Sequence, residues 1–156
     1  MMKKRYDAFC GLYCGACEIF LMNELGRIKE KAKEWDMKIE DLECFGCKSN
    51  QNAIYCRDCF FKECAASKEL DFCVECIDFP CNKLRDFRND KFPHHSIVLK
   101  NLEIIKEKGY KYWLVDQENR WKCKKCGLKF TWYEESCDNC GEKLYNCIEE
   151  EKNQIS

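Results

Sequence analysis

Sixteen cysteines in 156 residues constrain this chain more than any other feature of its sequence. Twelve of them form six Cys-x-x-Cys pairs, at positions 14/17, 44/47, 56/59, 73/76, 123/126 and 137/140. Random placement at this density gives only about 1.6 such pairs. On a tight turn this spacing directs two thiolates at one point, which suits tetrahedral metal binding, whereas a disulfide framework does not need it. The sequence therefore predicts metal sites, with the thiols reduced in a cytoplasmic compartment.

The rest of the composition also favours bound ions over a large apolar core. Hydrophobic residues make up 46% of the chain, but the cysteines are counted among them, and the remainder is thin for a core of this length. The net charge is −1, with basic residues concentrated in residues 82–132, so a general polyanion binder is not expected. The basic start is not followed by the apolar stretch of a signal peptide, and no run reaches the length of a membrane span. We therefore expect a cytoplasmic protein with no membrane partner.

The clearest site is near the C-terminus. Cys123 and Cys126 precede Gly127, and Cys137 and Cys140 precede Gly141, so the spacing is C-x2-C-x10-C-x2-C. Glycine at these positions permits the positive φ that closes a metal-binding turn. Residues 128–133 between the turns alternate and are rich in β-forming residues, as a short hairpin requires. The pattern resembles a zinc ribbon over residues 121–147, and a rubredoxin-like iron site with the same turns is the alternative.

Eleven further cysteines are candidate metal ligands in the first half of the chain: Cys10, Cys14, Cys17, Cys44, Cys47, Cys56, Cys59, Cys64, Cys73, Cys76 and Cys81. Residues 56–64 and 73–81 share the pattern C-x2-C-x4-C, which indicates a duplicated ligand-bearing turn. One grouping follows chain order, with positions 44, 47, 56 and 59 in one site and 64, 73, 76 and 81 in another. The competing grouping joins 56/59 to 73/76 and 14/17 to 44/47. Spacing alone does not decide between them, and each predicts two sites, with room for a third.

Some candidate residues have less certain roles. Under the first grouping, Cys10, Cys14 and Cys17 lack a fourth ligand, which could be a distant cysteine, one of the two histidines, or water. His94 and His95 are interpreted as exposed imidazoles at the start of a helix, with metal ligation by one of them as the alternative. Cys147 lies outside every pair, and the sequence does not distinguish a ligand from a spare thiol.

Helical periodicity appears between the cysteine groups. Apolar residues at spacings of three and four predict one helix over residues 18–35 and a shorter one within 36–43. Residues 82–92 read as a charged bridge that is helical in part. Ser96 is a predicted N-cap for a helix to residue 108, Gly109 a predicted stop, and residues 110–120 a second helix. Together the last two predict a helical hairpin.

These elements predict a small α+β protein stabilised by metal ions. Its predicted parts are a cysteine-rich multi-metal domain over residues 1–92, a helical hairpin linker over 93–120, a β zinc ribbon over 121–147 and a tail over 148–156.

The sequence Cys10-Gly11-Leu12-Tyr13-Cys14-Gly15-Ala16-Cys17, with Phe9 before it, resembles the opening of a cysteine-rich domain-of-unknown-function family of bacteria and archaea. The segments at 44–49, 56–64 and 73–84 follow in the family's order, so the resemblance covers about residues 6–90. Some members similarly carry a ribbon behind a helical linker. The resemblance implies metal binding, with zinc as the expected metal, and it implies no established activity.

We therefore interpret the chain as a non-catalytic protein that binds about three to four zinc ions and acts as an interaction module for a protein partner, because closed four-thiolate sites leave zinc no open position. Three alternatives remain. The chain could be an iron–sulfur or thiolate-based redox protein, although C-x2-C-x4-C is not a ferredoxin spacing. It could bind nucleic acid through the ribbon and residues 82–132. It could be an enzyme with an incomplete site at Cys10, Cys14 and Cys17.

Overall fold

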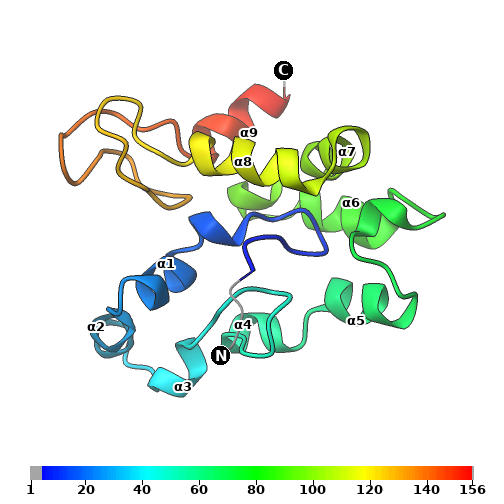
Figure 1. Ribbon diagram of the computed structural model, residues 1–156, viewed down its shortest axis with the longest axis horizontal. Helices are drawn as coiled ribbons and strands as arrows, with labels where there is room; N and C mark the ends of the chain where they lie inside the picture. The colour runs from blue at the N-terminus through cyan, green and yellow to red at the C-terminus, as the bar shows by residue number, and fades with distance from the viewer. Residues whose placement is uncertain (1–4, 156) are drawn as a thin grey trace.

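The computed structural model describes residues 5–155, which form nine α-helices and three short 3-10 turns (Figure 1). The α-helices are α1 (Glu18–Glu24), α2 (Ile28–Glu34), α3 (Ile39–Leu42), α4 (Ile54–Arg57), α5 (Phe60–Ser67), α6 (Asn82–Arg88), α7 (Val98–Lys108), α8 (Tyr110–Arg120) and α9 (Cys147–Ile155). The 3-10 turns are η1 (Cys14–Ala16), η2 (Cys73–Glu75) and η3 (Pro93–His95). Residues 1–4, which open the predicted 1–92 domain, and Ser156, which ends the predicted tail, lie outside the described residues. No described helix is long and apolar enough to cross a bilayer.

The predicted helical hairpin is present as α7 and α8, which pack along one side of the molecule (Figure 1). Gly109 separates the two helices with a φ of 89°, a conformation that favours glycine. The predicted cap differs, because Ile97 is the N-cap of α7 and the buried Ser96 hydroxyl has no hydrogen-bond partner in the described chain. Leu102 is fully buried, and the Asn101 side-chain amide donates to the Gly11 carbonyl at 2.9 Å. The hairpin is therefore part of the core around the N-terminal cysteine segment.

The predicted helix over residues 18–35 is divided into α1 and α2. Gly26 adopts a φ of 69° between them, in the left-handed region that ends a right-handed helix. Leu25, one of the apolar residues with this spacing, is 55% exposed, because the chain turns at this point. Residues 44–81, for which no helical periodicity is apparent in the sequence, also contain α4 and α5. Local periodicity continued across the glycine, and it could not reveal the break.

The α+β prediction is wrong, because residues 5–155 contain no β-strand. Only isolated bridges occur, and those in the predicted ribbon join Lys122 to Lys129 and Ser136 to Lys143. The β-forming segment 128–133 makes other contacts: Phe130 is buried in the core, and the Trp132 amide donates to the Ala16 carbonyl at 3.1 Å. Leu128 and Phe130 are bonded back to Cys123 and Trp121, while Trp132 is bonded to η1, so the segment makes one isolated bridge and no strand. The C-terminal module is therefore a pair of turns without a β-sheet.

A single buried cluster connects the predicted N-terminal domain, the helical hairpin and the C-terminal module. Trp113 of α8 is fully buried and packs edge-on to Tyr13, with ring centroids 6.0 Å apart. Leu84, Trp121 and Leu144 belong to the same cluster. The cysteine-bearing turns are therefore built onto the core formed by α7, α8 and the N-terminal segment.

Candidate metal centre

Two turns with matching backbone hydrogen bonds carry the C-terminal cysteines. In the first, the Cys123 amide donates to the Leu128 carbonyl at 2.8 Å, and the Gly127 amide returns to the Cys123 carbonyl at 2.8 Å. In the second, Cys137 and Gly141 repeat the pattern at 2.8 and 2.9 Å. Both glycines have positive φ, 80° and 76°. Each turn therefore places its two thiols on the same side, as the spacing predicts.

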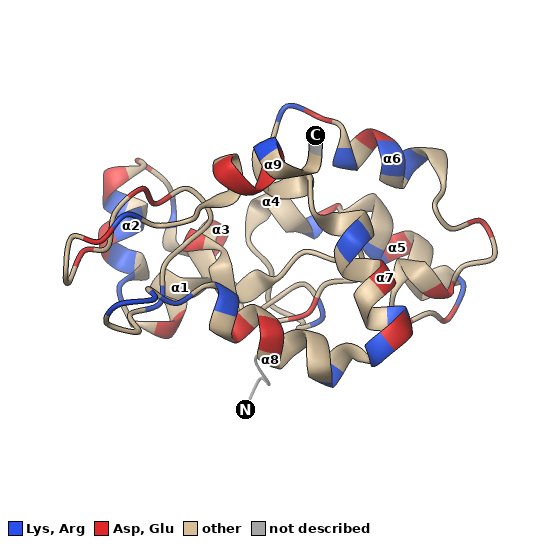
Figure 2. Cartoon of the chain, turned by 90° about the horizontal axis from the view of Figure 1, so that it is seen from above, with Lys and Arg blue, Asp and Glu red and all other residues tan. Residues whose placement is uncertain are grey.

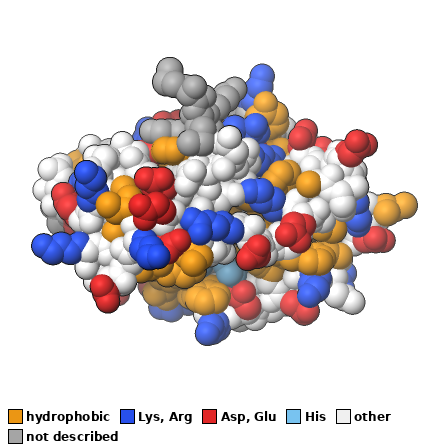
Figure 3. Space-filling view, turned by 90° about the horizontal axis from the view of Figure 1, so that it is seen from below, with side chains coloured by type: hydrophobic (Ala, Val, Ile, Leu, Met, Phe, Trp, Pro, Cys, Tyr) orange, Lys and Arg blue, Asp and Glu red, His pale blue; other side chains and the backbone are white. Residues whose placement is uncertain are grey.

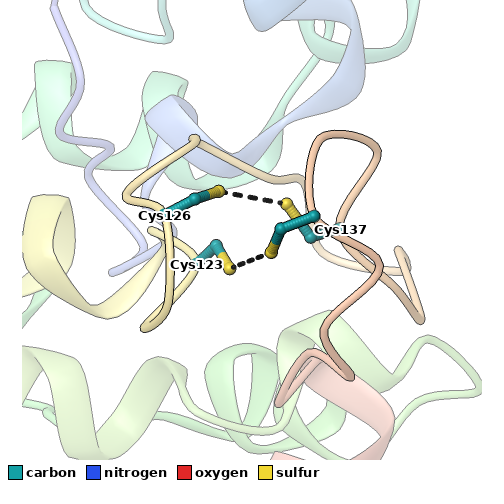
Figure 4. Close-up of side chains that lie close together, drawn as sticks. Cys123, Cys126 and Cys137 are labelled. Atoms are coloured by element: carbon teal, nitrogen blue, oxygen red, sulfur yellow. Dashed lines mark hydrogen bonds between the residues drawn. The ribbon is translucent and has the colours of Figure 1, made fainter.

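The two turns face each other and bring four sulfur atoms together (Figure 4). The Sγ atoms of Cys123, Cys126, Cys137 and Cys140 all lie within 4.8 Å of one another. Two of the separations, Cys123 to Cys140 and Cys126 to Cys137, are 3.5 Å. This is far longer than the roughly 2 Å of a disulfide and close to the about 3.8 Å expected between sulfurs around one tetrahedral zinc ion. All sixteen cysteines are free thiols. The four sulfurs could hold one metal ion.

The proton affinities of these thiols differ with their hydrogen bonds. The Asn139 side chain, and after it the Leu128 amide, lowers the pKa of Cys126 to about 6. The Cys126 amide leads the groups that lower the pKa of Cys123. The Glu142 amide also lowers the pKa of Cys140, but desolvation and the three neighbouring cysteines outweigh it and raise that pKa to about 12. Four thiols this close cannot all ionise without a cation, whose binding would release the remaining protons.

Aromatic packing joins this centre to the rest of the fold. Trp121 is buried against Phe130, with ring centroids 5.3 Å apart. The Arg120 guanidinium lies 4.0 Å from the Trp121 ring and pairs with Glu150 of α9 at 3.1 Å. The Cys147 amide donates to the Trp132 carbonyl at 2.8 Å. A metal ion between the turns would therefore brace α8 and α9 as well as the turns themselves.

The eleven N-terminal cysteines are less tightly grouped. In the described chain, the C-terminal set is the one group of three or more histidine, cysteine or carboxylate ligands whose ligand atoms all lie within 4.8 Å of one another. The roles of the N-terminal cysteines as ligands therefore stay a prediction. The structure nevertheless divides most of them between two neighbourhoods.

The first neighbourhood joins the turn at residues 14–17 to that at 44–47. The Gly46 amide donates to the Cys44 sulfur at 3.4 Å. Burial and the nearby Cys47 raise the pKa of Cys14, while the Cys47 amide donates to the Cys14 sulfur and partly offsets this. Burial raises the pKa of Cys17 to about 11, with Cys44 adding to the shift. This arrangement matches the 14/17 with 44/47 part of the second grouping.

Three other cysteines border this neighbourhood. Desolvation, followed by Cys17 and Cys44, raises the pKa of Cys56 to about 12, although much of the residue is exposed. Burial and then Cys47 raise the pKa of the buried Cys10, and Cys59 also contributes.

The second neighbourhood contains Cys64, Cys73, Cys76 and Cys81, which line a single cavity of about 210 Å³. This set is the second site of the grouping in chain order. The two neighbourhoods correspond to one set from each grouping, and the sharing of a metal ion within either set stays a prediction.

The histidines differ from their predicted environment. Both are half-buried in η3, not exposed. His94 lies against Trp132, and its Nδ1 is hydrogen-bonded to the Tyr133 hydroxyl at 2.7 Å, while the His95 ring stacks on Phe87 with centroids 3.7 Å apart. Neither belongs to a group of three metal ligands in the described chain. The His94 contacts join η3 to residues almost forty positions away, so no local pattern reveals them.

The comparisons with known proteins identify a family but no activity. The family model described as "Protein of unknown function (DUF3795)" matches residues 6–86. This segment contains every N-terminal candidate cysteine and ends before the C-terminal centre. No curated protein and no solved structure matches the chain.

Proposed function

Because the chain belongs to the DUF3795 family, whose function is unknown, we propose a function from its chemistry: it is a cytoplasmic, non-catalytic metal-binding protein whose C-terminal centre holds a structural zinc ion. The observation that carries this proposal is the set of four cysteine sulfurs within 4.8 Å of one another. Thiolate and tetrahedral geometry suit zinc, and four protein ligands leave no position for a reacting water. Free thiols in every cysteine fit a reducing compartment.

The ion would stabilise a part of the chain that has little core of its own. Behind the turns, the buried side chains are few, chiefly Trp121, Phe130 and Leu144. A structural zinc ion contributes on the order of 10 kcal/mol to folding in small domains. Residues 121–146 therefore depend on the metal for their conformation, and α9 is held against α8 through them.

We further propose that the partner of this module is a protein. Three large side chains of α8, Tyr110, Tyr112 and Val115, are 40%, 50% and 61% exposed. Two lysines of the C-terminal module lie near acids, since Lys122 is 3.6 Å from Glu118 and Lys125 is 3.9 Å from Glu142. Basic and acidic residues both occur on the helices (Figure 2) and are intermixed on the face shown in Figure 3. These features support a protein surface over a nucleic-acid surface.

The test is metal analysis of protein purified under reducing conditions. We expect the double variant Cys123→Ser and Cys126→Ser to lose one zinc ion per chain relative to the native protein. Cys147→Ser is the matched control, because Cys147 is buried near the module but lies outside the four-sulfur group; its zinc content should be unchanged. Chelation should also abolish the near-ultraviolet circular dichroism of Trp121. Equal zinc content in the double variant and the native chain would overturn the proposal.

A further inference from the structure

A second group of four cysteines surrounds a cavity on the opposite side of the family domain from the C-terminal turns. Cys64 comes from α5, Cys73 from η2, and Cys76 and Cys81 from the loop that leads to α6. All four are half-buried and line one cavity of about 210 Å³. A cavity lined by four thiols from three elements is a built site, and the spacing of its sulfurs indicates what it holds.

The sulfurs of this cavity are less closely grouped than those of the C-terminal centre. Around a single zinc ion the sulfurs are about 3.8 Å apart, and the C-terminal cysteines approach this value. No three of the cavity cysteines, all of which are described, have sulfurs within 4.8 Å of one another. In a four-iron cluster each thiolate binds a different corner of a cube of iron and sulfide, so the thiolates are held farther apart. We propose that Cys64, Cys73, Cys76 and Cys81 bind a [4Fe–4S] cluster.

The polar groups at the cavity favour thiolates bound to such a cluster. The Lys68 ammonium donates to the Cys76 sulfur at 3.3 Å, and the Asp78 amide donates to the same sulfur at 3.4 Å. Lys83 also lines the cavity. Four thiolates around either a zinc ion or an oxidised [4Fe–4S] core carry a net charge of about −2, so the lysines stabilise both occupants. The spacing of the sulfurs, not the charge, selects the cluster.

Much of the remaining lining is apolar, although Asp78 and Asn82 also contribute to it. Phe61 and Leu84 are 9% and 1% exposed, and Phe79 also lines the cavity. Burial of this kind protects a cluster from hydrolysis and influences its reduction potential. The C-x2-C-x4-C spacing is not that of a ferredoxin. One repeat supplies only three cysteines, and the fourth, Cys64, comes from the preceding repeat. The fold therefore assembles a set of four ligands that a single repeat does not contain.

The direct test is to purify the native protein without oxygen, reconstitute it with ferrous iron and sulfide, and measure iron, sulfide and zinc. We expect the double variant Cys73→Ser and Cys76→Ser to lose about four irons and about four sulfides per chain with the cluster's visible absorption. The matched double variant Cys123→Ser and Cys126→Ser should keep all of the iron and lose zinc instead. Loss of zinc without iron from the Cys73/Cys76 variant, or absence of iron from the native protein, would overturn the proposal.

A second variant places the cluster even if removing two ligands prevents folding. Lys68→Met leaves the four cysteines intact but removes a positive charge and a hydrogen bond from Cys76. Both stabilise the more negative, reduced cluster, so the reduction potential should become more negative at unchanged iron content. Lys124→Met is the control, because Lys124 is an exposed lysine beside the other centre. An unchanged potential in Lys68→Met would overturn the assignment to this cavity. The C-terminal zinc site is unaffected by either result, so the two proposals fail separately.

Discussion

His94 lies flat against Trp132, with ring centroids 4.1 Å apart and ring planes 14° from parallel. The contact joins η3, which precedes the helical hairpin, to the segment between the two C-terminal cysteine turns. The neighbouring Tyr133 hydroxyl holds His94 Nδ1 in place. An imidazole in this setting couples the position of the C-terminal module to the rest of the fold.

Protonation of His94 should therefore destabilise the protein. Burial, with the nearby His95, lowers the pKa of His94 to about 3 from its ordinary value of 6.5. Between these values the unfolded chain takes up a proton that the folded chain does not, so stability is retained above pH 6.5 and falls as the pH drops toward 3. One proton corresponds to about 1.4 kcal/mol per pH unit.

His94→Phe keeps a ring against Trp132 but removes the titrating group, and its unfolding free energy should depend less steeply on pH in this window. Urea unfolding of both proteins from pH 7 to pH 4 measures the difference. Metal release at low pH affects both proteins alike and cancels in the comparison. If the unfolding free energies of the two proteins changed equally with pH, His94 would not titrate as described.

Asp7 is a buried carboxylate whose removal should be costly. It is 1% exposed and pairs with Arg5 at 2.9 Å and with the buried Lys48 at 3.0 Å. Asp7→Asn leaves the Lys48 ammonium without its counter-charge, and breaking a buried pair costs about 3–5 kcal/mol. The exposed Asp116 of α8 provides the control, and Asp116→Asn should change stability by less than about 0.5 kcal/mol.

The pH dependence of stability provides a second test of the role of Asp7. Burial raises the pKa of Asp7, but Arg5 and Lys48 outweigh it and hold the pKa below its ordinary value. The stability from the carboxylate is thus present above the pKa of the unfolded chain and is lost as the pH falls through the lowered folded value. The difference in unfolding free energy between the native protein and Asp7→Asn should become smaller only in that acid range. A difference that is small at neutral pH would contradict the role given to Asp7.

Two glycines with positive φ distinguish crowding from backbone strain. A Cβ at Gly46, where φ is 108°, would lie 1.9 Å from the Arg5 carbonyl oxygen, whereas nothing lies within 4 Å of one at Gly26, where φ is 69°. Gly26→Ala should cost about 1–2 kcal/mol from the backbone conformation alone. Gly46→Ala should cost at least about twice as much, measured from denaturant midpoints at a constant m-value. Equal costs would mean that the segment at Arg5 moves away freely.

The predictable parts of this protein depend on neighbours in the sequence. The turns at Cys123–Gly127 and Cys137–Gly141 were recognisable because Cys-x-x-Cys-Gly specifies a local conformation. Helices α7 and α8 were recognisable because a periodicity of 3.6 is also local, and Gly109 marks their boundary. Gly26 is also a possible helix end. However, a glycine destabilises a helix by too little for the sequence to show whether the helix continues through it or ends there.

The tertiary structure decided what required distant partners. The Trp132 amide is bonded to the Ala16 carbonyl, over a hundred residues earlier, and residues 128–133 form an isolated bridge in place of the expected β-hairpin. The tertiary structure also brings residues 14–17 close to 44–47, and Cys64 to the same cavity as the second repeat, although spacing left the groupings equal. The spacing of the cysteines indicates that they can bind metal ions. Which cysteines share the same ion depends on long-range backbone contacts, and no local pattern encodes these.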